Sequence, residues 1–218
     1  MILAIDTATQ FAGLALYNED GIFAEETWYA ERNHTTELMP RLSRMLNLAK
    51  LEVVHLTALA VSLGPGSFTG LRIGLAIAKG LALPHKLPVV GVPTLEITAY
   101  PFRDIKLPVW SVAQAGRGRL LAACFDRQDD RWQAIIAPHL TTIETLAEKI
   151  EHFVLFVGEI DQAAAKELQR HSHHKAQIVS PATRLRRPGY LAEIAAYRLK
   201  ASDQDDPDAL VPIYASSP

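Results

Sequence analysis

The loop from Gly64 to Arg72, with the sequence Gly-Pro-Gly-Ser-Phe-Thr-Gly-Leu-Arg, is the segment whose residue types and spacing are most capable of chemistry. Its first two glycines permit positive φ, and the proline between them stiffens the turn. Ser67 or Thr69 can cap the helix expected to follow, which leaves backbone N–H groups at the start of that helix. Such groups bind an anion or a carboxylate of a partner protein, so the sequence predicts a binding loop here.

Two catalytic motifs of similar composition do not fit this loop. A Walker loop requires Lys and then Ser or Thr after its last glycine, but Gly70 is followed by Leu71 and Arg72. A nucleophile elbow requires Gly two residues before its serine, and Pro65 occupies that position before Ser67. A rigid structural turn with an N-cap therefore remains as the alternative to a binding loop.

The histidines are a second set of candidates, and their surroundings favour structural roles. His34 stands at the start of an expected helix, with Leu38 one turn later. A transition-metal site on a helix needs a second ligand on the same face, and Leu38 cannot supply one. His34 is therefore predicted to be a helix-start residue. The polar stretch with His171, His173 and His174 is predicted to be solvated rather than metal-binding.

Periodicity predicts the elements that position these residues. Short apolar runs predict strands at residues 2–5, 13–17, 22–29, 59–63 and 88–92, with helices at 35–49 and 73–82. A similar order returns as strands at 108–112, 119–126, 132–137, 154–157 and 177–179, with helices at 143–150 and 161–170. The repeated order predicts a duplicated α/β fold, as in the actin-like, sugar-kinase-like and Hsp70-like ATPases.

In such folds an acidic residue after the first strand begins a phosphate-binding hairpin, and Asp6-Thr7-Ala8-Thr9 occupies this place. The segment contains no glycine, which hinders its N–H groups from closing on phosphate oxygens. Gln114 stands where a second hairpin would bring a carboxylate, so little is left to hold Mg²⁺. Asp6, Thr7 and Thr9 are therefore predicted to form a weak, degenerate cofactor site, with a structural role for Asp6 favoured.

The helix after the loop carries a row of small residues, because Gly70, Gly74 and Ala78 are spaced four residues apart. Each helical glycine costs about 1 kcal/mol relative to alanine, and a closely packed backbone usually offsets this cost. Ile73 and Ile77 form a bulky row beside it. The small row is predicted to face a helix of a partner protein, with packing on the chain's own sheet as the alternative.

Composition limits the functional classes. With 218 residues, of which 49% are hydrophobic, the chain can bury a substantial core without disulfides. No apolar run reaches membrane-spanning length and the first residues lack a signal-peptide pattern, so a soluble cytoplasmic protein is expected. A net charge of −2 argues against a stand-alone nucleic-acid binder. Cys124 is most simply a buried thiol. Arg117 with Arg119, and Arg184 with Arg186 and Arg187, are most simply solvated loop residues. A contact of Arg184, Arg186 and Arg187 with nucleic acid stays open.

Four segments resemble the TsaB (YeaZ) family in sequence and order: Met1 to Ala8, His34 to Pro40, Gly64 to Lys79, and Val92 to Glu96. The resemblance is strong in the first half of the chain. It implies a bacterial, cytoplasmic subunit of the machinery that makes N6-threonylcarbamoyladenosine in tRNA. In that family the transferase TsaD carries the chemistry, TsaB pairs with it, and the ATPase TsaE joins them.

Beyond residue 105 the resemblance weakens. Where the family has Asp-Ala-Arg, this chain has Gln114-Ala115-Gly116-Arg117. The usual ending Pro-x-Tyr-Leu-Arg survives only as Pro212-Ile213-Tyr214, followed by Ala215 and Ser216. Contacts that the replaced side chains make in the family are therefore not expected of this chain.

The resemblance implies an actin-like (ASKHA, ribonuclease H-like) fold of two lobes, residues 1–105 and 106–218, each a mixed sheet flanked by helices. The implied function is that of a non-catalytic scaffold that binds TsaD, forms a homodimer when alone, and meets TsaE and tRNA within the complex. No metal or cofactor is expected to be required by this subunit, while ATP or ADP at the complex interface stays open. The predicted partner interface combines the loop with the apolar face of the helix before it and the small-residue side of the helix after it: His34, Leu38, Leu42, Met45, Gly64, Gly66, Ser67, Phe68, Thr69, Gly70, Arg72, Ile73, Gly74, Ile77 and Ala78.

Two functions of other classes stay open as alternatives. An ATP-dependent small-molecule kinase of the same fold would turn over ATP with magnesium. A glycoprotease-like peptidase would need a nucleophile with a base, or a pair of metal ligands. The sequence assigns neither set, because Ser67 has no identifiable histidine and His34 has no partner histidine.

Overall fold

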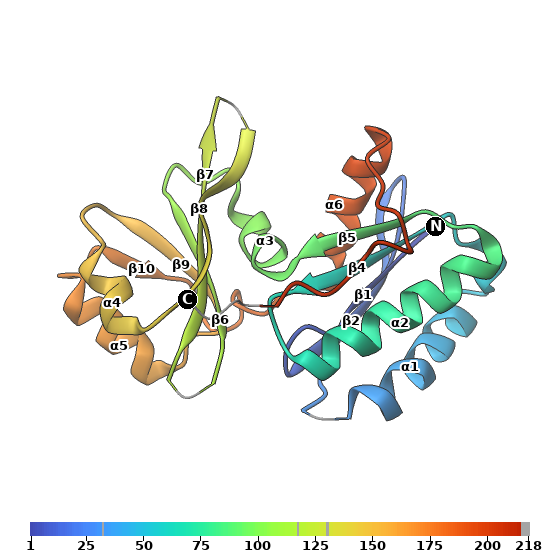
Figure 1. The fold of residues 1–218 in the computed structure, drawn as a ribbon, viewed down its shortest axis with the longest axis horizontal. Coiled ribbons are helices and arrows are strands. Elements are labelled where there is room, and N and C mark those ends of the chain that lie inside the picture. Colours follow the sequence, from blue (N-terminus) through green and yellow to red (C-terminus); the bar gives the residue numbers. More distant parts are fainter. Residues whose placement is uncertain (32, 117, 130, 215–218) are drawn as a thin grey trace. The chain divides into compact units, whose positions relative to one another are not determined.

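Two compact units make up the computed structural model, which describes residues 1–31, 33–116, 118–129 and 131–214 (Figure 1). Unit 1 contains Met1–Ile97 and Arg187–Ile213, and unit 2 contains Thr98–Arg186 together with Tyr214. This division differs from the expected lobes 1–105 and 106–218, because the chain returns to unit 1 after residue 186. Three residues named in the sequence analysis lie outside the described ranges: Arg117, Ala215 and Ser216.

Unit 1 is built on a five-stranded sheet in the order β3-β2-β1-β4-β5. The strands are β1 (Ile2–Asp6), β2 (Phe11–Asn18), β3 (Gly21–Tyr29), β4 (Ala58–Gly64) and β5 (Val89–Pro93). The first three pair antiparallel, whereas β4 pairs parallel with both β1 and β5. Every residue of β4 is buried, as expected of an apolar central strand that is covered on both faces.

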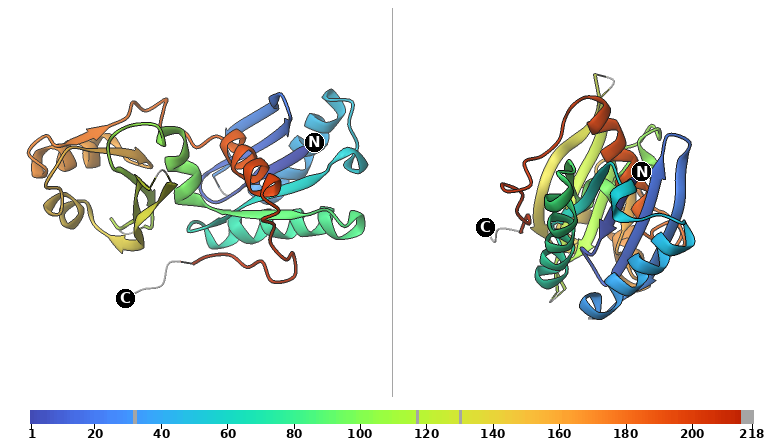
Figure 2. Two further views of the ribbon diagram at one scale, coloured as in Figure 1. Left: turned by 90° about the horizontal axis from the view of Figure 1, so that it is seen from above. Right: turned by 90° about the vertical axis from the view of Figure 1, so that its right-hand side faces the viewer.

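Helices cover both faces of this sheet. Helices α1 (His34–Leu48) and α2 (Phe68–His85) lie on one face, and α6 (Pro188–Lys200) lies on the other (Figure 2). Neighbouring residues of a strand point to opposite faces of the sheet, so residues of β1 and β2 contact either α2 or α6 in alternation. Ile5 points toward α2, while Gly13, which pairs with Asp6, lies against Pro188 of α6.

The apolar pattern of α1 gives the predicted helix, with its apolar side packed in the core of unit 1. The predicted helix at 35–49 is confirmed with a start at His34, and its buried side consists of His34, Leu38, Leu42, Met45 and Leu46. Helix α2 begins at Phe68, earlier than the predicted start at Ile73. The earlier start has a local cause, since the Ser67 hydroxyl accepts a hydrogen bond from the Gly70 backbone N–H at 3.2 Å and so caps the helix.

Unit 2 repeats the strand order of unit 1. Its sheet runs β10-β9-β6-β7-β8, with β6–β7–β8 antiparallel and β9 parallel to both β6 and β10. These elements are β6 (Val109–Gln114), β7 (Leu120–Gln128), β8 (Arg131–Thr141), β9 (Val154–Gly158) and β10 (Ala176–Ile178), with helices α4 (Ile143–Glu148) and α5 (Gln162–His171). The duplicated α/β fold predicted from the sequence is therefore confirmed. The remaining short elements are α3 (Thr94–Ala99) and the 3-10 turns η1 (Val53–His55) and η2 (Tyr100–Phe102).

The core of unit 2 contains the single cysteine. Cys124 lies on β7 as a buried free thiol, as predicted, and burial raises its pKa to about 12. Its neighbours in the apolar core include Trp110, Ala122 and Phe156. Across the described ranges, no helix is both long and apolar enough to span a membrane.

Candidate functional site

The turn after β1 and the loop after β4 form one packed structure. The Thr7 hydroxyl donates to the Gly70 carbonyl oxygen at 2.7 Å, and the Ser67 backbone N–H donates to the Ala8 carbonyl oxygen at 2.7 Å. An ideal Cβ placed on Gly66 would overlap that same Ala8 carbonyl. The loop from Gly64 to Gly70 therefore covers the turn at Asp6, and the two sites predicted separately from the sequence lie together.

The covered turn is not an accessible phosphate hairpin, which corrects the predicted weak cofactor site. Asp6, Thr7 and Thr9 are only 2%, 0% and 8% exposed. The Ala8 N–H donates to a carboxylate oxygen of Asp6 at 3.0 Å, and the Thr7 N–H donates to the Ser62 hydroxyl at 3.4 Å. Because these N–H groups point into the protein, the structural role favoured for Asp6 is the one that the geometry supports.

The row of small residues on α2 faces the chain's own β1, so its assignment to a partner interface is wrong. An added Cβ would overlap the Thr7 carbonyl oxygen at Gly70 and the Thr7 hydroxyl oxygen at Gly74. Ala78 is fully buried in the core of unit 1. The alternative named above, packing on the chain's own sheet, is the correct one, because only glycine lets α2 approach β1 this closely.

The two loop glycines have different reasons to be glycine. Gly64 adopts a φ of +106°, a conformation that residues with a side chain rarely adopt. Gly66 has no positive φ, contrary to the expectation that both would use this freedom. It is glycine because the Ala8 backbone passes too close for a Cβ.

His34 has the helix-start role predicted for it, whereas its place in the predicted partner interface is wrong because its side chain is buried. It is the first residue of α1, is 5% exposed, and its Nε2 lies 2.9 Å from the Thr9 carbonyl oxygen. This contact ties the start of α1 to the covered turn. Within the described residues, no group of three or more His, Cys, Asp or Glu side chains could hold a metal ion.

The apolar side of α1 is also internal, which removes three more residues from the predicted interface. Leu38, Leu42 and Met45 are 0%, 2% and 6% exposed and belong to the main core of unit 1. Sequence periodicity identified this side correctly as apolar, but an apolar stripe usually faces the protein's own core. The sides of α1 and α2 that are left exposed are the opposite ones.

Several predicted interface residues do lie on that outer side. Ser67, Phe68, Thr69 and Arg72 are exposed, and the Arg72 guanidinium lies over the Phe68 ring, 3.7 Å from its centroid. Ile73 and Ile77 are half-buried, in partial contact with the core.

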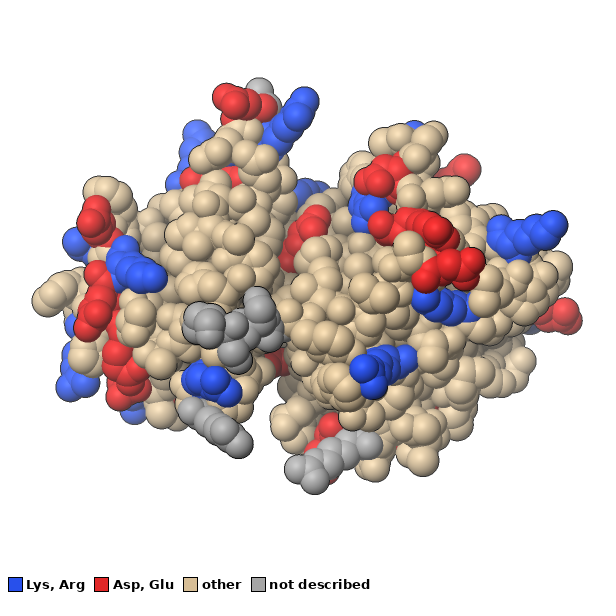
Figure 3. All heavy atoms as spheres, viewed as in Figure 1, with Lys and Arg blue, Asp and Glu red and all other residues tan. Residues whose placement is uncertain are grey.

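Sequence reasoning missed two exposed apolar residues, Met39 of α1 and Leu83 of α2. The signal for them was present in the helical period. Leu83 lies eleven residues after Arg72, which is close to three full turns and therefore on the same outer side. Figure 3 shows that charged side chains are sparse over α2 on the face in view.

The three arginines near the start of α6 are held by contacts within the protein. Arg187, expected to be a solvated loop residue, donates from Nε to the Glu25 carboxylate at 2.9 Å, and this hydrogen bond raises the pKa of Arg187. Arg184 donates to the Ile160 carbonyl oxygen, and Arg186 is only 9% exposed. These arginines are therefore engaged within the protein, which corrects the expectation of solvated loops.

The turn after β6 holds a feature that the sequence analysis missed. The Gln114 backbone N–H donates to the Glu159 carboxylate at 2.9 Å, and the Gln114 side-chain amide donates to the Glu159 carbonyl oxygen at 3.2 Å. At the expected position of a second phosphate hairpin, the backbone N–H of Gln114 is therefore already bonded to Glu159. Glu159 follows β9 directly, and only the parallel pairing of β9 with β6 brings it to Gln114.

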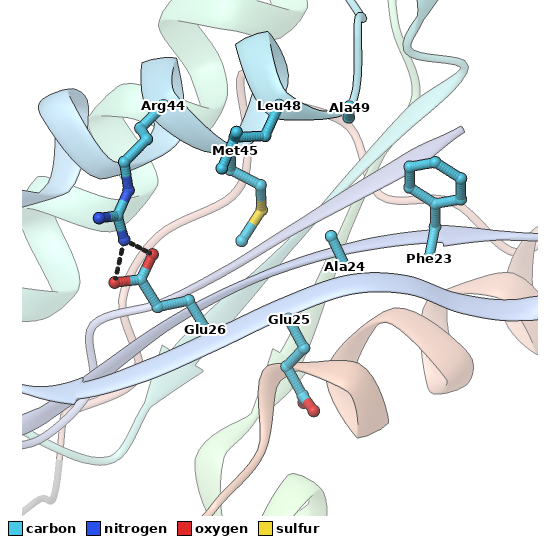
Figure 4. Close-up of a pocket in the computed structure, with 8 residues that line it drawn as sticks. All are labelled: Phe23, Ala24, Glu25, Glu26, Arg44, Met45, Leu48 and Ala49. Atoms are coloured by element: carbon cyan, nitrogen blue, oxygen red, sulfur yellow. Dashed lines mark hydrogen bonds and ion pairs between the residues drawn. The ribbon is translucent and has the colours of Figure 1, made fainter.

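A groove of about 480 Å³ lies between β3 and the second half of α1 (Figure 4). Glu26 closes one end by pairing with Arg41 and Arg44, and the Arg44–Glu26 distance is 3.0 Å. The other lining residues are mostly apolar: Phe23, Ala24, Met45, Leu48 and Ala49, with Glu25. Glu25 points away toward α6, as its bond to Arg187 requires, so the groove contains no convergent set of catalytic groups.

Comparisons with known proteins all point to the biosynthesis of threonylcarbamoyladenosine in tRNA, with a family model described as TsaD and relatives named TsaB. Residues 19–217 match the family model described as TsaD: tRNA N6-adenosine threonylcarbamoyltransferase. The chain is 30% identical to the tRNA threonylcarbamoyladenosine biosynthesis protein TsaB of Bacillus subtilis over 98% of this chain and 93% of that protein. It is 46% identical to the TsaB protein of Escherichia coli over 45% of this chain and 42% of that protein.

Solved structures agree on the fold. A protein from Pseudomonas aeruginosa described as similar to peptidase YEAZ superposes with a TM-score of 0.79 at 21% identity, over 99% of both chains. YeaZ from Pseudomonas aeruginosa gives a TM-score of 0.78 at 21% identity, over 98% of both chains. At this level of identity the likeness concerns the fold alone.

Proposed function

Because the chain belongs to the TsaB family of tRNA threonylcarbamoyladenosine biosynthesis proteins, we propose that it serves this modification as a non-catalytic subunit that binds a TsaD-type transferase. The proposed binding surface is the outer side of α1 and α2, called the helical face below. The exposed apolar side chains of this face are the observation that carries the proposal. The helical face consists of Met39, Phe68, Arg72, Ile73, Ile77 and Leu83.

The helical face exposes three large apolar side chains to solvent. Met39 is 45% exposed, Phe68 is 55% exposed and Leu83 is 56% exposed. Single exposed apolar residues are common on soluble proteins, whereas a patch on two neighbouring helices is typical of a protein interface. Arg72 over Phe68 adds an aromatic and an arginine, which are the residue types enriched at the centres of such interfaces.

The orientation of α1 supports a continuous surface with α2. Arg41 of α1 pairs with Glu26 on β3, so that flank of the helix faces the edge of the sheet. Met39 precedes Arg41 by two residues, about 200° around the helix, and therefore lies on the flank toward α2. The half-buried Ile73 and Ile77 of α2 pack against the core of unit 1 and leave part of their surface exposed. Two helices of a partner laid along this seam would complete a four-helix bundle.

The closed turn at Asp6 supports the non-catalytic part of the proposal. A phosphate hairpin works through N–H groups that are open to the ligand, but those of Thr7 and Ala8 are bonded within unit 1. His34 is bonded to the Thr9 carbonyl oxygen instead of facing a metal or a substrate. A nucleotide at the subunit interface would therefore be held by groups of the transferase.

The test combines the chain with the TsaD protein of the same organism. We expect size-exclusion chromatography with light scattering to show a complex of the two. With the remaining components of the modification system present, threonylcarbamoyladenosine should form only where both proteins are present. The isolated chain should not hydrolyse ATP. Steady magnesium-dependent ATP turnover by the chain alone, abolished by Asp6→Ala, would support the kinase alternative, and peptidase activity abolished by Ser67→Ala would support the peptidase alternative.

Two matched variants locate the surface. Phe68→Asp places a charge in the helical face, while helix folding is preserved because an acidic residue in the first turn is favourable. Val54→Asp makes a similar change at a residue of η1 that is 64% exposed and lies outside the helical face. We expect Phe68→Asp to weaken TsaD binding at least about tenfold, as for a residue at an interface centre, and Val54→Asp to leave it unchanged. Wild-type affinity in Phe68→Asp would show that the partner binds elsewhere.

Further associations follow from the same proposal. The isolated chain is expected to pair with a second copy through the helical face, because a two-fold interface uses the same patch on both subunits. Phe68→Asp should therefore also make the isolated chain monomeric. The ATPase TsaE and the tRNA are expected to meet the chain within the assembled complex.

A further inference from the structure

Residues 203–213, the segment after α6, lie along β5 and the end of β4 and are called the C-terminal strap below (Figure 1). The strap makes one antiparallel bridge, between Asp205 and Val89 of β5, and otherwise consists of turns and irregular backbone. Segments near the end of a chain are poorly ordered unless specific contacts tie them down. The contacts of the strap therefore indicate what it does for unit 1.

The strap and α6 occupy backbone groups of β5. The Asp205 N–H donates to the Val89 carbonyl oxygen at 3.0 Å, and the Asp205 carboxylate accepts a hydrogen bond from the Gly91 N–H at 2.8 Å. Arg198 of α6 donates to the Gly91 carbonyl oxygen at 2.8 Å. Because β5 is the outermost strand of its sheet, these are the groups to which a further strand would bind.

A charged clasp, formed by Arg198, Asp203 and Asp205, holds the first part of the strap. The Arg198 guanidinium binds Asp203 at 2.7 Å and Asp205 at 3.2 Å. Hydrogen bonds between ionised groups are stronger than those between neutral groups. The clasp therefore fixes Asp205 at the place where it covers β5.

Apolar and backbone contacts hold the second part of the strap. Leu210 is 6% exposed and belongs to the core of unit 1. Its side chain and that of Leu63 lie so close to Gly91 that an added Cβ would overlap both. The Ile213 N–H donates to the Leu63 carbonyl oxygen at 2.7 Å. The strap is thus held at two places, with the covered groups of β5 at the first.

The other outermost strands of the two sheets are protected against further pairing in different ways. Charged residues, very short length, proline and irregular register all discourage the addition of a strand. The edge strand β3 carries Glu25 and Glu26 near its middle, and β10 has only three residues. The edge strand β8 contains Pro138 and has register shifts in its pairing with β7. By contrast, β5 has no charged residue and no proline before its last position, Pro93.

We infer that the C-terminal strap is an intramolecular guard of the β5 edge, and that β5 pairs with β5 of a second copy of the chain when the strap opens. A second copy fits because antiparallel pairing about a two-fold axis at Gly91 places Val90 opposite Val92. Pairs of β-branched residues stabilise such a ladder, and no like charges meet across it. Arg198 is then a positioning residue, since it holds the guard closed. The inference goes beyond the proposed function and does not depend on TsaD.

The test compares full-length Asp205→Ala with the wild type by hydrogen exchange and by sedimentation equilibrium at a series of protein concentrations. The change removes the acceptor of the Gly91 N–H and one partner of Arg198. The Ile213 N–H reports opening of the strap, because Asp205 is not its acceptor. Only open chains can pair through β5, so self-association should increase with the open fraction. We expect exchange at Ile213 to be at least about tenfold faster, and self-association at least about tenfold tighter.

Asp208→Ala is the matched control. It makes the same substitution and the same change of charge at an exposed residue of the strap outside the clasp. We expect wild-type exchange and wild-type self-association in this variant. Asp205→Asn keeps the size of the side chain and should change both quantities in the same direction as Asp205→Ala, but less.

Several results would overturn the inference. Faster exchange at Ile213 without tighter self-association would show that β5 needs no guard, and unchanged exchange would show that the clasp does not hold the strap. Equal effects of Asp205→Ala and Asp208→Ala would assign the change to net charge. In the associated form the Gly91 N–H should become protected again, and fast exchange there would exclude pairing at β5.

One further variant separates this contact from the helical face. When Phe68→Asp is added to Asp205→Ala, the additional self-association should remain, because β5 lies outside the helical face. Its disappearance would place the contact on α2 and overturn the role of the strap. Failure of the wild-type chain to bind TsaD would overturn the proposed function and leave the guard of β5 as it stands.

Discussion

The close approach of α2 to β1 makes a sharp prediction for Gly74. In an exposed helix, Gly→Ala stabilises the folded state by about 0.5–1 kcal/mol, because glycine has the larger conformational freedom to lose. At Gly74 the added Cβ would overlap the Thr7 hydroxyl oxygen, which also donates to the Gly70 carbonyl oxygen at 2.7 Å. The variant must therefore move Thr7 or shift the helix away from the sheet.

The magnitude follows from the groups involved. Overpacking a close-packed contact costs typically 1–3 kcal/mol, and losing the Thr7 hydrogen bond costs about 1 kcal/mol more. Against the gain in helix propensity, Gly74→Ala should lower the free energy of unfolding by about 2 kcal/mol. For a chain of this length that corresponds to a melting temperature lower by about 4–8 °C.

The matched control lies in the same helix. Gly80 has nothing within 4 Å of its ideal Cβ, so Gly80→Ala should raise the free energy of unfolding by about 0.5–1 kcal/mol. Urea denaturation followed by far-UV circular dichroism measures both variants. In the double variant Thr7→Ala with Gly74→Ala, the clash is absent, so the loss should be smaller than the two single losses added together. A Gly74→Ala protein as stable as the wild type would refute the close packing of α2 on β1.

Three further predictions concern charged and titratable groups. Burial raises the pKa of Glu96 above its usual 4.5 despite the opposing effect of Arg198, so ionisation is disfavoured in the folded state. The unfolding free energy should therefore fall as pH rises from about 4.5 through the folded pKa, and Glu96→Gln should flatten this fall in melting temperatures measured from pH 4 to 7. Cys124, with a pKa of about 12, should resist iodoacetamide at pH 8 until the protein is denatured, which mass spectrometry can follow; rapid labelling of folded protein would contradict its burial. Glu25→Ala removes the acceptor of Arg187 and should lower the free energy of unfolding by roughly 1–3 kcal/mol in urea titrations, whereas an unchanged midpoint would show that this pair does not hold α6 to β3.

Local chemistry in the sequence determined much of this protein. Alternating apolar runs and turn residues located the strands of both units, and the 3.6-residue period located the buried side of α1. The hydroxyl residues before a helical pattern predicted a cap by Ser67 or Thr69, and the structure shows that Ser67 is the cap of α2. These features depend on residues a few positions apart, so the sequence contains them directly.

Only the tertiary structure decided what packs against the apolar side of α1 and the small-residue row of α2. The period showed that Gly70 and Gly74 share a row, but a partner helix and the chain's own β1 require the same small residues. The return of α6 to unit 1 depends on contacts such as Glu25 with Arg187, which are 162 positions apart and leave no local pattern. A periodic sequence specifies which side of an element is buried, whereas the element that buries it is set by the packing of the whole chain.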